Sequence, residues 1–309
     1  MLRALALFAV LLTSASAPPI HATVFDHTGL RLTDVVWTGG RFLYVENTTN
    51  ALWTKGSPPT LFASMPRVVE ETRCKVSPGA HGFPSGYLFC HSPDNVVYRV
   101  RLADGAVSVF ARLPTKAIAD GALDFDTVGK FGFRLLAATG RSGASSRRGG
   151  TVYAVSAGGA VQQIGSYSAV GGADELIVAP ARFGAASGQI VLTADAGKSG
   201  SLVLMDERGR TRTVAKLPDG PNPIVAIPTR PHATPGAQPG LYATDTNSTN
   251  VFFVPAAKLS RYAGSLVVGS ELRGLFWTVT ASADGLSVKR IPLTLPGKGF
   301  NLENAIYVG

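Results

Sequence analysis

The sequence predicts an all-β fold, a six-bladed β-propeller of four-stranded antiparallel blades closed by its C-terminal strand. Three observations predict it. A hairpin pattern recurs six times at spacings of roughly 40 to 60 residues, the range of propeller blades and solenoid coils. The chain holds 35 glycines and 20 prolines, which supply turns. No stretch shows the sustained 3.6-residue apolar period of an amphipathic helix.

Each copy of the hairpin has the same order: a strand ending in polar residues, a short turn, and a second apolar strand. The clearest copies are GLYATDTNSTNVFFV (240–254) and RFLYVENTTNALW (41–53). The other four begin at residues 86, 133, 188 and 264. Alternating apolar residues around Asn, Ser and Gly turns are typical of antiparallel strands.

Apolar strands flank most of the hairpins. A preceding strand is expected at residues 32–37, 72–77, 121–126, 173–180 and 222–228, and a following one at 61–66, 109–114, 161–168, 213–218 and 288–293. Four antiparallel strands repeated radially leave few sheet edges exposed. A chain of 309 residues can form one such domain rather than two.

The last two copies are irregular. The fifth hairpin, 240–254, has no obvious fourth strand, and the sixth, 264–279, has no obvious first strand. The C-terminal segment GFNLENAIYVG (299–309) matches GLRLTDVVWTG (29–39) in its apolar pattern. We therefore expect residues 304–309 to form the innermost strand of the last blade, beside the first blade.

Residues 1–22 have the pattern of a secretory signal peptide: Arg3, an apolar run at 4–12, then small residues. The apolar run is too short for a membrane-spanning helix of about 20 residues. Cleavage after Ala17 or after Ala22 fits, and an uncleaved anchor is the alternative. We expect a mature propeller domain at 23–309, secreted to an extracellular or periplasmic space, without a membrane span and monomeric.

The chain carries a formal net charge of +9, which raises nucleic acid as a partner. Its basic residues are dispersed, and one cluster, Arg141 with Arg147 and Arg148, lies in a glycine-rich segment. We interpret that cluster as a solvated hairpin loop and expect no nucleic-acid partner.

The two cysteines, Cys74 and Cys90, are equidistant from Gly82. A turn centred on Gly82 would place them opposite each other on neighbouring strands, about 4.5 to 5.5 Å apart, which a disulfide can bridge. The sequence therefore predicts a structural disulfide. A metal-binding or reactive thiol pair is the alternative, but the spacing is not that of a metal site.

Acidic and amide residues gather where the topology brings strand ends to one face of the propeller. At the starts of the first strands lie Asp34, Glu70, Glu71, Asp120, Asp174, Glu175, Asn222, Glu303 and Asn304. At the ends of the second strands lie Glu46, Asp94, Asp195, Asp245 and Glu271. The alternative interpretation is that these residues serve only as turn formers and bind no ligand, since Asp and Asn are common in turns.

Carboxylates that converge on one mouth repel one another unless a cation or a proton relieves them. Oxygen ligands suit Ca²⁺, Mg²⁺ or Mn²⁺. Such a cation could polarise an ester or lactone carbonyl. The sequence shows no H-E-x-x-H or G-x-S-x-G motif, so the usual signals of zinc proteases and serine hydrolases are missing.

The phrases GRFLYVEN and GLYATDTNSTNVFFV, the export signal and the blade count resemble the gluconolactonase and strictosidine synthase-like propellers. The resemblance implies a six-bladed fold with an axial site and, in the gluconolactonase branch, a divalent cation held by Glu, Asn and Asp residues. That family's first-blade Glu would fall near Asp34, and its later ligands near Asp120, Asp174 and Asn222. Aspartate stands here for the family's glutamate.

Two hypotheses of different class follow. The first is a cation-dependent hydrolase of lactones or esters, with Asp34, Asp174 and Asn222 as metal ligands and Glu175 or Asp120 as general base. Further candidates at the axial mouth are Glu71, Glu303 and Asn304. The second is a non-catalytic extracellular propeller that binds a small molecule, a carbohydrate or another partner through its loops.

Overall fold

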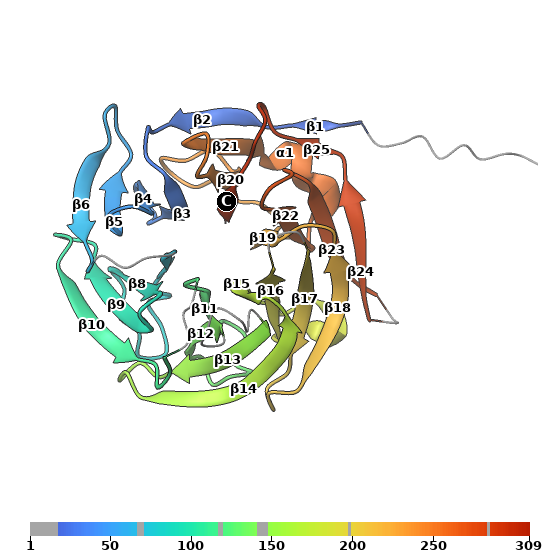
Figure 1. Ribbon diagram of the computed structural model, residues 1–309. Coiled ribbons are helices and arrows are strands. Elements are labelled where there is room, and N and C mark those ends of the chain that lie inside the picture. The colour runs from blue at the N-terminus through green and yellow to red at the C-terminus, as the bar shows by residue number, and fades with distance from the viewer. Residues whose placement is uncertain (1–17, 67–70, 117–119, 141–147, 197–198, 283–284) are drawn as a thin grey trace, which may run out of the picture.

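The computed structural model describes residues 18–66, 71–116, 120–140, 148–196, 199–282 and 285–309. Six four-stranded antiparallel sheets are arranged in a ring, each with its innermost strand towards the centre (Figure 1). The prediction of a six-bladed β-propeller is confirmed. Residues 1–17 of the predicted signal peptide (1–22), Glu70, Arg141 and Arg147 lie outside the described residues.

The first four blades follow one another along the chain. Their strands are given from the innermost outwards. Blade 1 is β3 (Leu32–Trp37), β4 (Phe42–Glu46), β5 (Ala51–Thr54) and β6 (Thr60–Ser64), and blade 2 is β7 (Arg73–Val76), β8 (Tyr87–Ser92), β9 (Val96–Arg101) and β10 (Val107–Arg112). Blade 3 is β11 (Leu123–Phe125), β12 (Leu135–Gly140), β13 (Arg148–Val155) and β14 (Val161–Val170), and blade 4 is β15 (Gly172–Val178), β16 (Ile190–Asp195), β17 (Gly200–Met205) and β18 (Thr211–Leu217).

Blades 5 and 6 exchange strands. Blade 5 is β19 (Pro221–Ala226), β22 (Leu266–Ser270), β23 (Phe276–Ser282) and β24 (Gly285–Ile291). Blade 6 is β26 (Leu302–Val308), β20 (Gly240–Asp245), β21 (Asn250–Pro255) and β2 (Thr23–His27). The chain thus leaves blade 5 after its first strand, builds the hairpin of blade 6, and returns.

The C-terminal strand is innermost in its blade and closes the ring, as predicted, but its expected partner was wrong. It pairs with β20 of the 240–254 hairpin, with Ala243 opposite Ala305, and not with the 264–279 hairpin. The missing first strand of that later hairpin is β19, whose Ile224 faces Val268. The sequence pattern could not show this, because both inner strands are equally apolar.

The N-terminal segment supplies the fourth strand that the 240–254 hairpin lacks in sequence. Strand β2 pairs with β21, and β1 (Ile20–His21) lies parallel to β25 (Leu293–Thr294). Ile20 and Ala22 are both buried in the core. Cleavage after Ala22 would remove this contact, whereas cleavage after Ala17 would keep it.

Helices are minor. In the described parts of the chain they are α1 (Ala256–Leu259) and the 3-10 turns η1 (Gly184–Ala186) and η2 (Ser260–Tyr262). Within the described ranges, the structure contains no helix of the length and hydrophobicity that crossing a membrane requires.

The hydrophobic core is divided into clusters, several of which lie between neighbouring blades. One joins blades 1 and 2 and contains Leu43, Leu52, Leu88 and Val100, all fully buried. The inner strands are buried along nearly their whole length, as in β3. This packing fixes the polar ends of the inner strands at the centre of the ring.

The predicted disulfide is confirmed. Cys74 on β7 faces Cys90 on β8 in register, and the two form a disulfide with a Cα–Cα distance of 4.1 Å. Both side chains are buried in the cluster between blades 1 and 2. The bond fixes β7, the inner strand of blade 2, to its neighbour.

Removing this disulfide by Cys74→Ala with Cys90→Ala is expected to lower the free energy of unfolding by about 3 kcal/mol, because the unfolded chain gains the entropy of an open loop. Urea unfolding of the oxidised protein, the double variant and the reduced protein measures this. Equal midpoints for all three would contradict the stabilising role.

Candidate functional site

All six inner strands contribute polar side chains to a cluster around the ring centre, which we call the axial cluster. It consists of Asp34 (β3), Glu71, Arg73 and Lys75 (on or next to β7), Asp124 (β11), Asp174 and Glu175 (β15), Asn222 (β19), and Glu303 and Asn304 (β26).

Irregular pairing recurs at this end of the inner strands. The register shifts between Leu32 and Asp34 in β3, between Ala173 and Glu175 in β15, and also near the starts of β19 and β26. Consecutive residues of a regular strand point to opposite faces, whereas a bulge can redirect one of them. The bulge in β15 lets both Asp174 and Glu175 approach the same arginine.

Arg73 is the centre of the axial cluster. Its side chain is fully buried, and its Nη1 donates a hydrogen bond of 2.6 Å to the Thr33 carbonyl. Its Nη2 pairs with Glu71 and lies 3.2 Å from Glu303 Oε2 and 3.5 Å from Asp174 Oδ1; its Nε lies 3.8 Å from Glu175 Oε2. The guanidinium of Arg73 thus contacts carboxylates from blade 4, from blade 6 and from its own blade, blade 2.

Lys75 is the second cation of the axial cluster. It lies two residues after Arg73, and its Nζ is 3.7 Å from Glu175 Oε1. The lysine side chain keeps 22 % of its surface exposed, while that of Glu175 keeps 1 %. Lys75 is therefore the cation of the cluster that water reaches.

The three predicted metal ligands all lie in the axial cluster, but in different environments. Asp34 is 1 % exposed, and its Oδ2 accepts a 2.6 Å hydrogen bond from the Cys74 amide. Asp174 is engaged by Arg73. Asn222 is fully buried and donates through Nδ2 to Glu303 Oε2 at 3.4 Å.

The two predicted general bases are separated by depth. Glu175 is buried, and its Oε2 accepts a 2.5 Å hydrogen bond from Asn304 Nδ2. Asp120 is half-buried and close enough for its charge to act on Asp174. Only Asp120 is reachable by solvent.

Several polar atoms of the axial cluster are buried without a hydrogen-bond partner among the described residues. They are Asp34 Oδ1, Glu175 Oε1, Asn222 Oδ1, Asn304 Oδ1 and Arg73 Nε. Buried polar atoms are normally satisfied by protein, water or a bound ligand. Four of the five are acceptor oxygens, so the cluster lacks donors or positive charge.

Charge and burial shift the acidity of the cluster. Six carboxyl groups (Asp34, Glu71, Asp124, Asp174, Glu175, Glu303) face two cations, Arg73 and Lys75, an excess of four negative charges when all are ionised.

Burial raises the pKa of Asp34 to about 7 and that of Asp124 to about 6, against the opposing charge of Lys75. Burial, then the charge of Glu71, raises the pKa of Asp174 and of Glu303. These groups therefore hold protons at a pH where exposed carboxyls have lost them.

The acidic residues at the second-strand ends divide into two kinds. Glu46, Asp94 and Asp245 accept hydrogen bonds from the backbone of the turns that follow them, as with Thr48 and Thr49 on Glu46. Glu271 differs, because burial and then the neighbouring Asp195 raise its pKa to about 8. Of the second-strand acidic residues, we therefore add only Glu271 and Asp195 to the group of interacting carboxyls.

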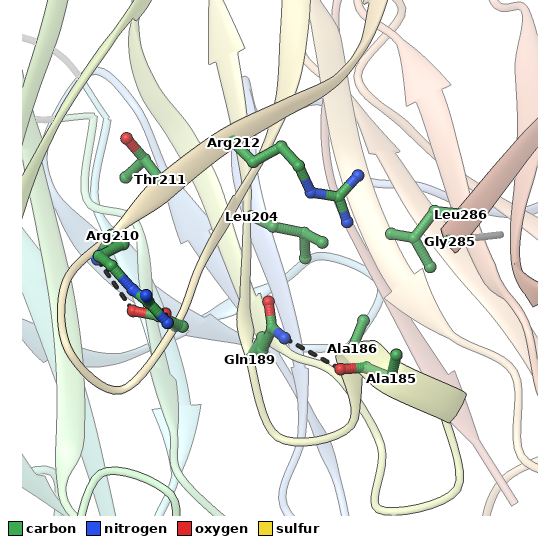
Figure 2. Close-up of a pocket in the computed structure, with 10 residues that line it drawn as sticks. Ala185, Ala186, Gln189, Leu204, Arg210, Thr211, Arg212, Gly285 and Leu286 are labelled. Carbon is green, nitrogen blue, oxygen red and sulfur yellow. Dashed lines mark hydrogen bonds and ion pairs between the residues drawn. The ribbon is translucent and has the colours of Figure 1, made fainter. Parts of the chain in front are cut away.

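The structure also has an outer pocket of about 310 Å³, lined by residues of blades 4 and 5 (Figure 2). Arg210 at its edge is paired with Asp206 at 2.7 Å, and Gln189 donates to the Ala185 carbonyl. The side chain of Arg212 extends towards Leu286 and Gly285 in this view. The outer pocket contains none of the axial residues.

Sequence analysis missed Arg73, Lys75 and Asp124. A signal was present, since Arg73 and Lys75 alternate with Cys74 in TRCKVS and must share the strand face opposite the disulfide. Among the described residues, no group of three or more His, Cys, Asp or Glu has the arrangement of a metal site.

No protein-family model and no curated protein matches the chain. Among solved structures, it is similar to a virginiamycin B lyase from Staphylococcus aureus at 11% identity and a TM-score of 0.48, covering 91% of this chain and 72% of that one.

The chain is also similar to a putative 6-phosphogluconolactonase from Bacteroides fragilis at 12% identity and a TM-score of 0.46, covering 89% of this chain and 72% of that one. A protein from Lactobacillus plantarum is similar at 14% identity and a TM-score of 0.45, covering 88% of this chain and 70% of that one.

Proposed function

We propose that the axial cluster binds a divalent cation (Ca²⁺, Mg²⁺ or Mn²⁺), and that the protein is an exported hydrolase of lactones or esters that works at this mouth. The unsatisfied acceptor oxygens of Asp34, Glu175, Asn222 and Asn304 support this proposal. They come from four different blades and are all nearly or fully buried. Carboxylate and amide oxygens are the ligands that hard cations prefer.

The ligand set proposed here differs from the one expected from the sequence. Asp34 and Asn222 are kept, because each has a free oxygen. Asp174 is replaced by Glu175 and Asn304, because each of these two has a buried oxygen without a hydrogen-bond partner among the described residues and Asp174 has none. Glu175 is included although its carboxylate also lies 3.7 Å from Lys75 and 3.8 Å from Arg73. The set contains two carboxylates and two amides, and the excess of negative charge in the cluster favours a cation.

The chain's own residues would divide the remaining work. Arg73 holds Glu175, Asp174 and Glu303 in place through its ion pairs. Asp120, at the solvent-reachable edge, would accept a proton from attacking water as general base. A bound divalent cation would supply polarisation of the substrate carbonyl.

Titration calorimetry with Ca²⁺, Mn²⁺ and Mg²⁺ tests the proposal. We expect binding that weakens at least about tenfold in Asp34→Asn, roughly 1.4 kcal/mol. Affinity should rise between about pH 6 and about pH 8, because protons compete for the carboxyl of Asp34, whose pKa lies at about 7. Asp104→Asn is the matched control, because Asp104 pairs with Arg101 on the exposed surface.

Catalysis is tested separately by hydrolysis of a panel of lactones and aryl esters with and without a chelator. Asp120→Asn should abolish turnover and leave cation binding unchanged. Absence of binding heat and of any cation-induced thermal shift would reject the cation site. Cation binding without turnover of any ester or lactone would reject only the hydrolase.

The second candidate is a non-catalytic extracellular binding propeller. Arg73 and Lys75 favour it, because they already balance part of the acidic charge inside the ring. An axial cluster of that kind would serve to hold the six inner strands together. Rejection of the cation site in the calorimetry would favour this function.

A further inference from the structure

A second pocket lies at the other end of three inner strands, and we call it the lower pocket. It has a volume of about 530 Å³, within the range of small-molecule sites. Its lining includes Ile227, which directly follows β19, Tyr307 near the end of β26, and Arg182 in the loop after β15.

The lower pocket is separate from the axial cluster. Tyr307 lies three residues beyond Asn304 on β26, a distance of roughly 10 Å at 3.3 Å per strand residue. None of the ten residues that line the lower pocket belongs to the axial cluster. A ligand in one site does not need the other.

The wall of the lower pocket is mostly apolar. Ala226, Ile227, Pro228 and Tyr307 are among its lining residues. Ile227 is 2 % exposed, and its amide and carbonyl are used in hydrogen bonds to Ser265 and Gly264. The backbone at this wall is therefore satisfied and rigid, and the pocket offers mainly hydrophobic surface.

Arg182 gives the lower pocket its charge. The side chain is exposed, and among the described residues no ion pair or hydrogen bond is found for its guanidinium. No aspartate or glutamate is among the lining residues. Arg230, a second basic residue, directly follows the lining residue Thr229 in the chain.

We propose that the lower pocket binds a small organic anion with an apolar body, a carboxylate or sulfonate attached to an aromatic or aliphatic ring system. The apolar body lies against Pro228 and Tyr307, which are partly exposed, and the anionic group pairs with Arg182. A free guanidinium beside an apolar wall recognises both parts of such a ligand.

Two dyes of nearly the same shape separate the two contributions: anilinonaphthalene sulfonate, which is anionic, and the neutral phenylnaphthylamine. We expect both to bind the folded protein, followed by fluorescence. Arg182→Ala should weaken binding of the anionic dye by about tenfold or more and leave the neutral dye unchanged. Thr229→Trp, at an exposed lining position, should weaken both dyes by filling the pocket.

Arg212→Ala is the matched control, because Arg212 is an exposed arginine of the outer pocket. It should change neither dye's affinity, and circular dichroism should show all variants folded. Anionic dye binding that survives both Arg182→Ala and Thr229→Trp would overturn the proposal. Equal losses for both dyes in Arg182→Ala would overturn the anion contact.

Discussion

Replacing Arg73 with methionine is expected to destabilise the protein by about 3 to 5 kcal/mol at neutral pH, the range found when one partner of a buried ion pair is removed. Methionine keeps much of the buried volume but removes the charge that faces Glu71, Asp174, Glu175 and Glu303. Those carboxylates would stay buried without compensation. Urea unfolding followed by circular dichroism measures the loss.

The pH dependence distinguishes lost charge from lost packing. Without Arg73, the pKa values of Asp174 and Glu303, which burial already raises, rise further above their unfolded values, so the folded state binds more protons. Stability of Arg73→Met should then fall as pH rises from about 5 to about 8, and its deficit should shrink at the acidic end. A pure packing defect would give a deficit independent of pH.

Two further variants complete this test. Arg73→Lys keeps one positive charge but not the planar fork that reaches several carboxylates, so partial recovery is expected. Arg101→Met is the control, because the Arg101–Asp104 pair is on the surface, where ion pairs contribute little. Unfolding of Arg101→Met like that of Arg73→Met would contradict the central role of the axial arginine.

Deleting the C-terminal strand, residues 302–309, is expected to abolish cooperative folding. Strand β26 is the innermost strand of blade 6, and Leu302, Ala305 and Val308 are buried in the core. Its loss would leave β20 as an unpaired inner edge and remove Glu303 and Asn304 from the axial cluster. Thermal unfolding of the truncated protein should show no transition.

A synthetic peptide of residues 299–309, added to the truncated protein, should restore the transition, whereas a scrambled peptide should not. Deletion of 18–22 is the matched truncation at the other end. It removes β1 and the buried Ile20 and is expected to cost only about 1.5 to 3 kcal/mol. A C-terminal truncation as stable as the N-terminal one would show that ring closure does not depend on β26.

The blade pattern was predictable because it is local. Each hairpin carries its own alternation of apolar and polar residues and its own turn, and the disulfide followed from register about Gly82. The exchange between blades 5 and 6 was not predictable, because β19 and β26 are both largely buried inner strands and their local sequence does not show which hairpin each one joins.

The sequence alone determined the all-β class, the six blades, the closing role of the C-terminal strand, the disulfide, and the gathering of acidic and amide residues at the starts of inner strands. Only the tertiary structure decided which of them meet. Bulges in β3, β15, β19 and β26 redirect side chains across the ring, and Arg73 pairs with a carboxylate 230 residues away in sequence. Such contacts depend on backbone irregularities and on long-range packing, which leave no periodic signal in the chain.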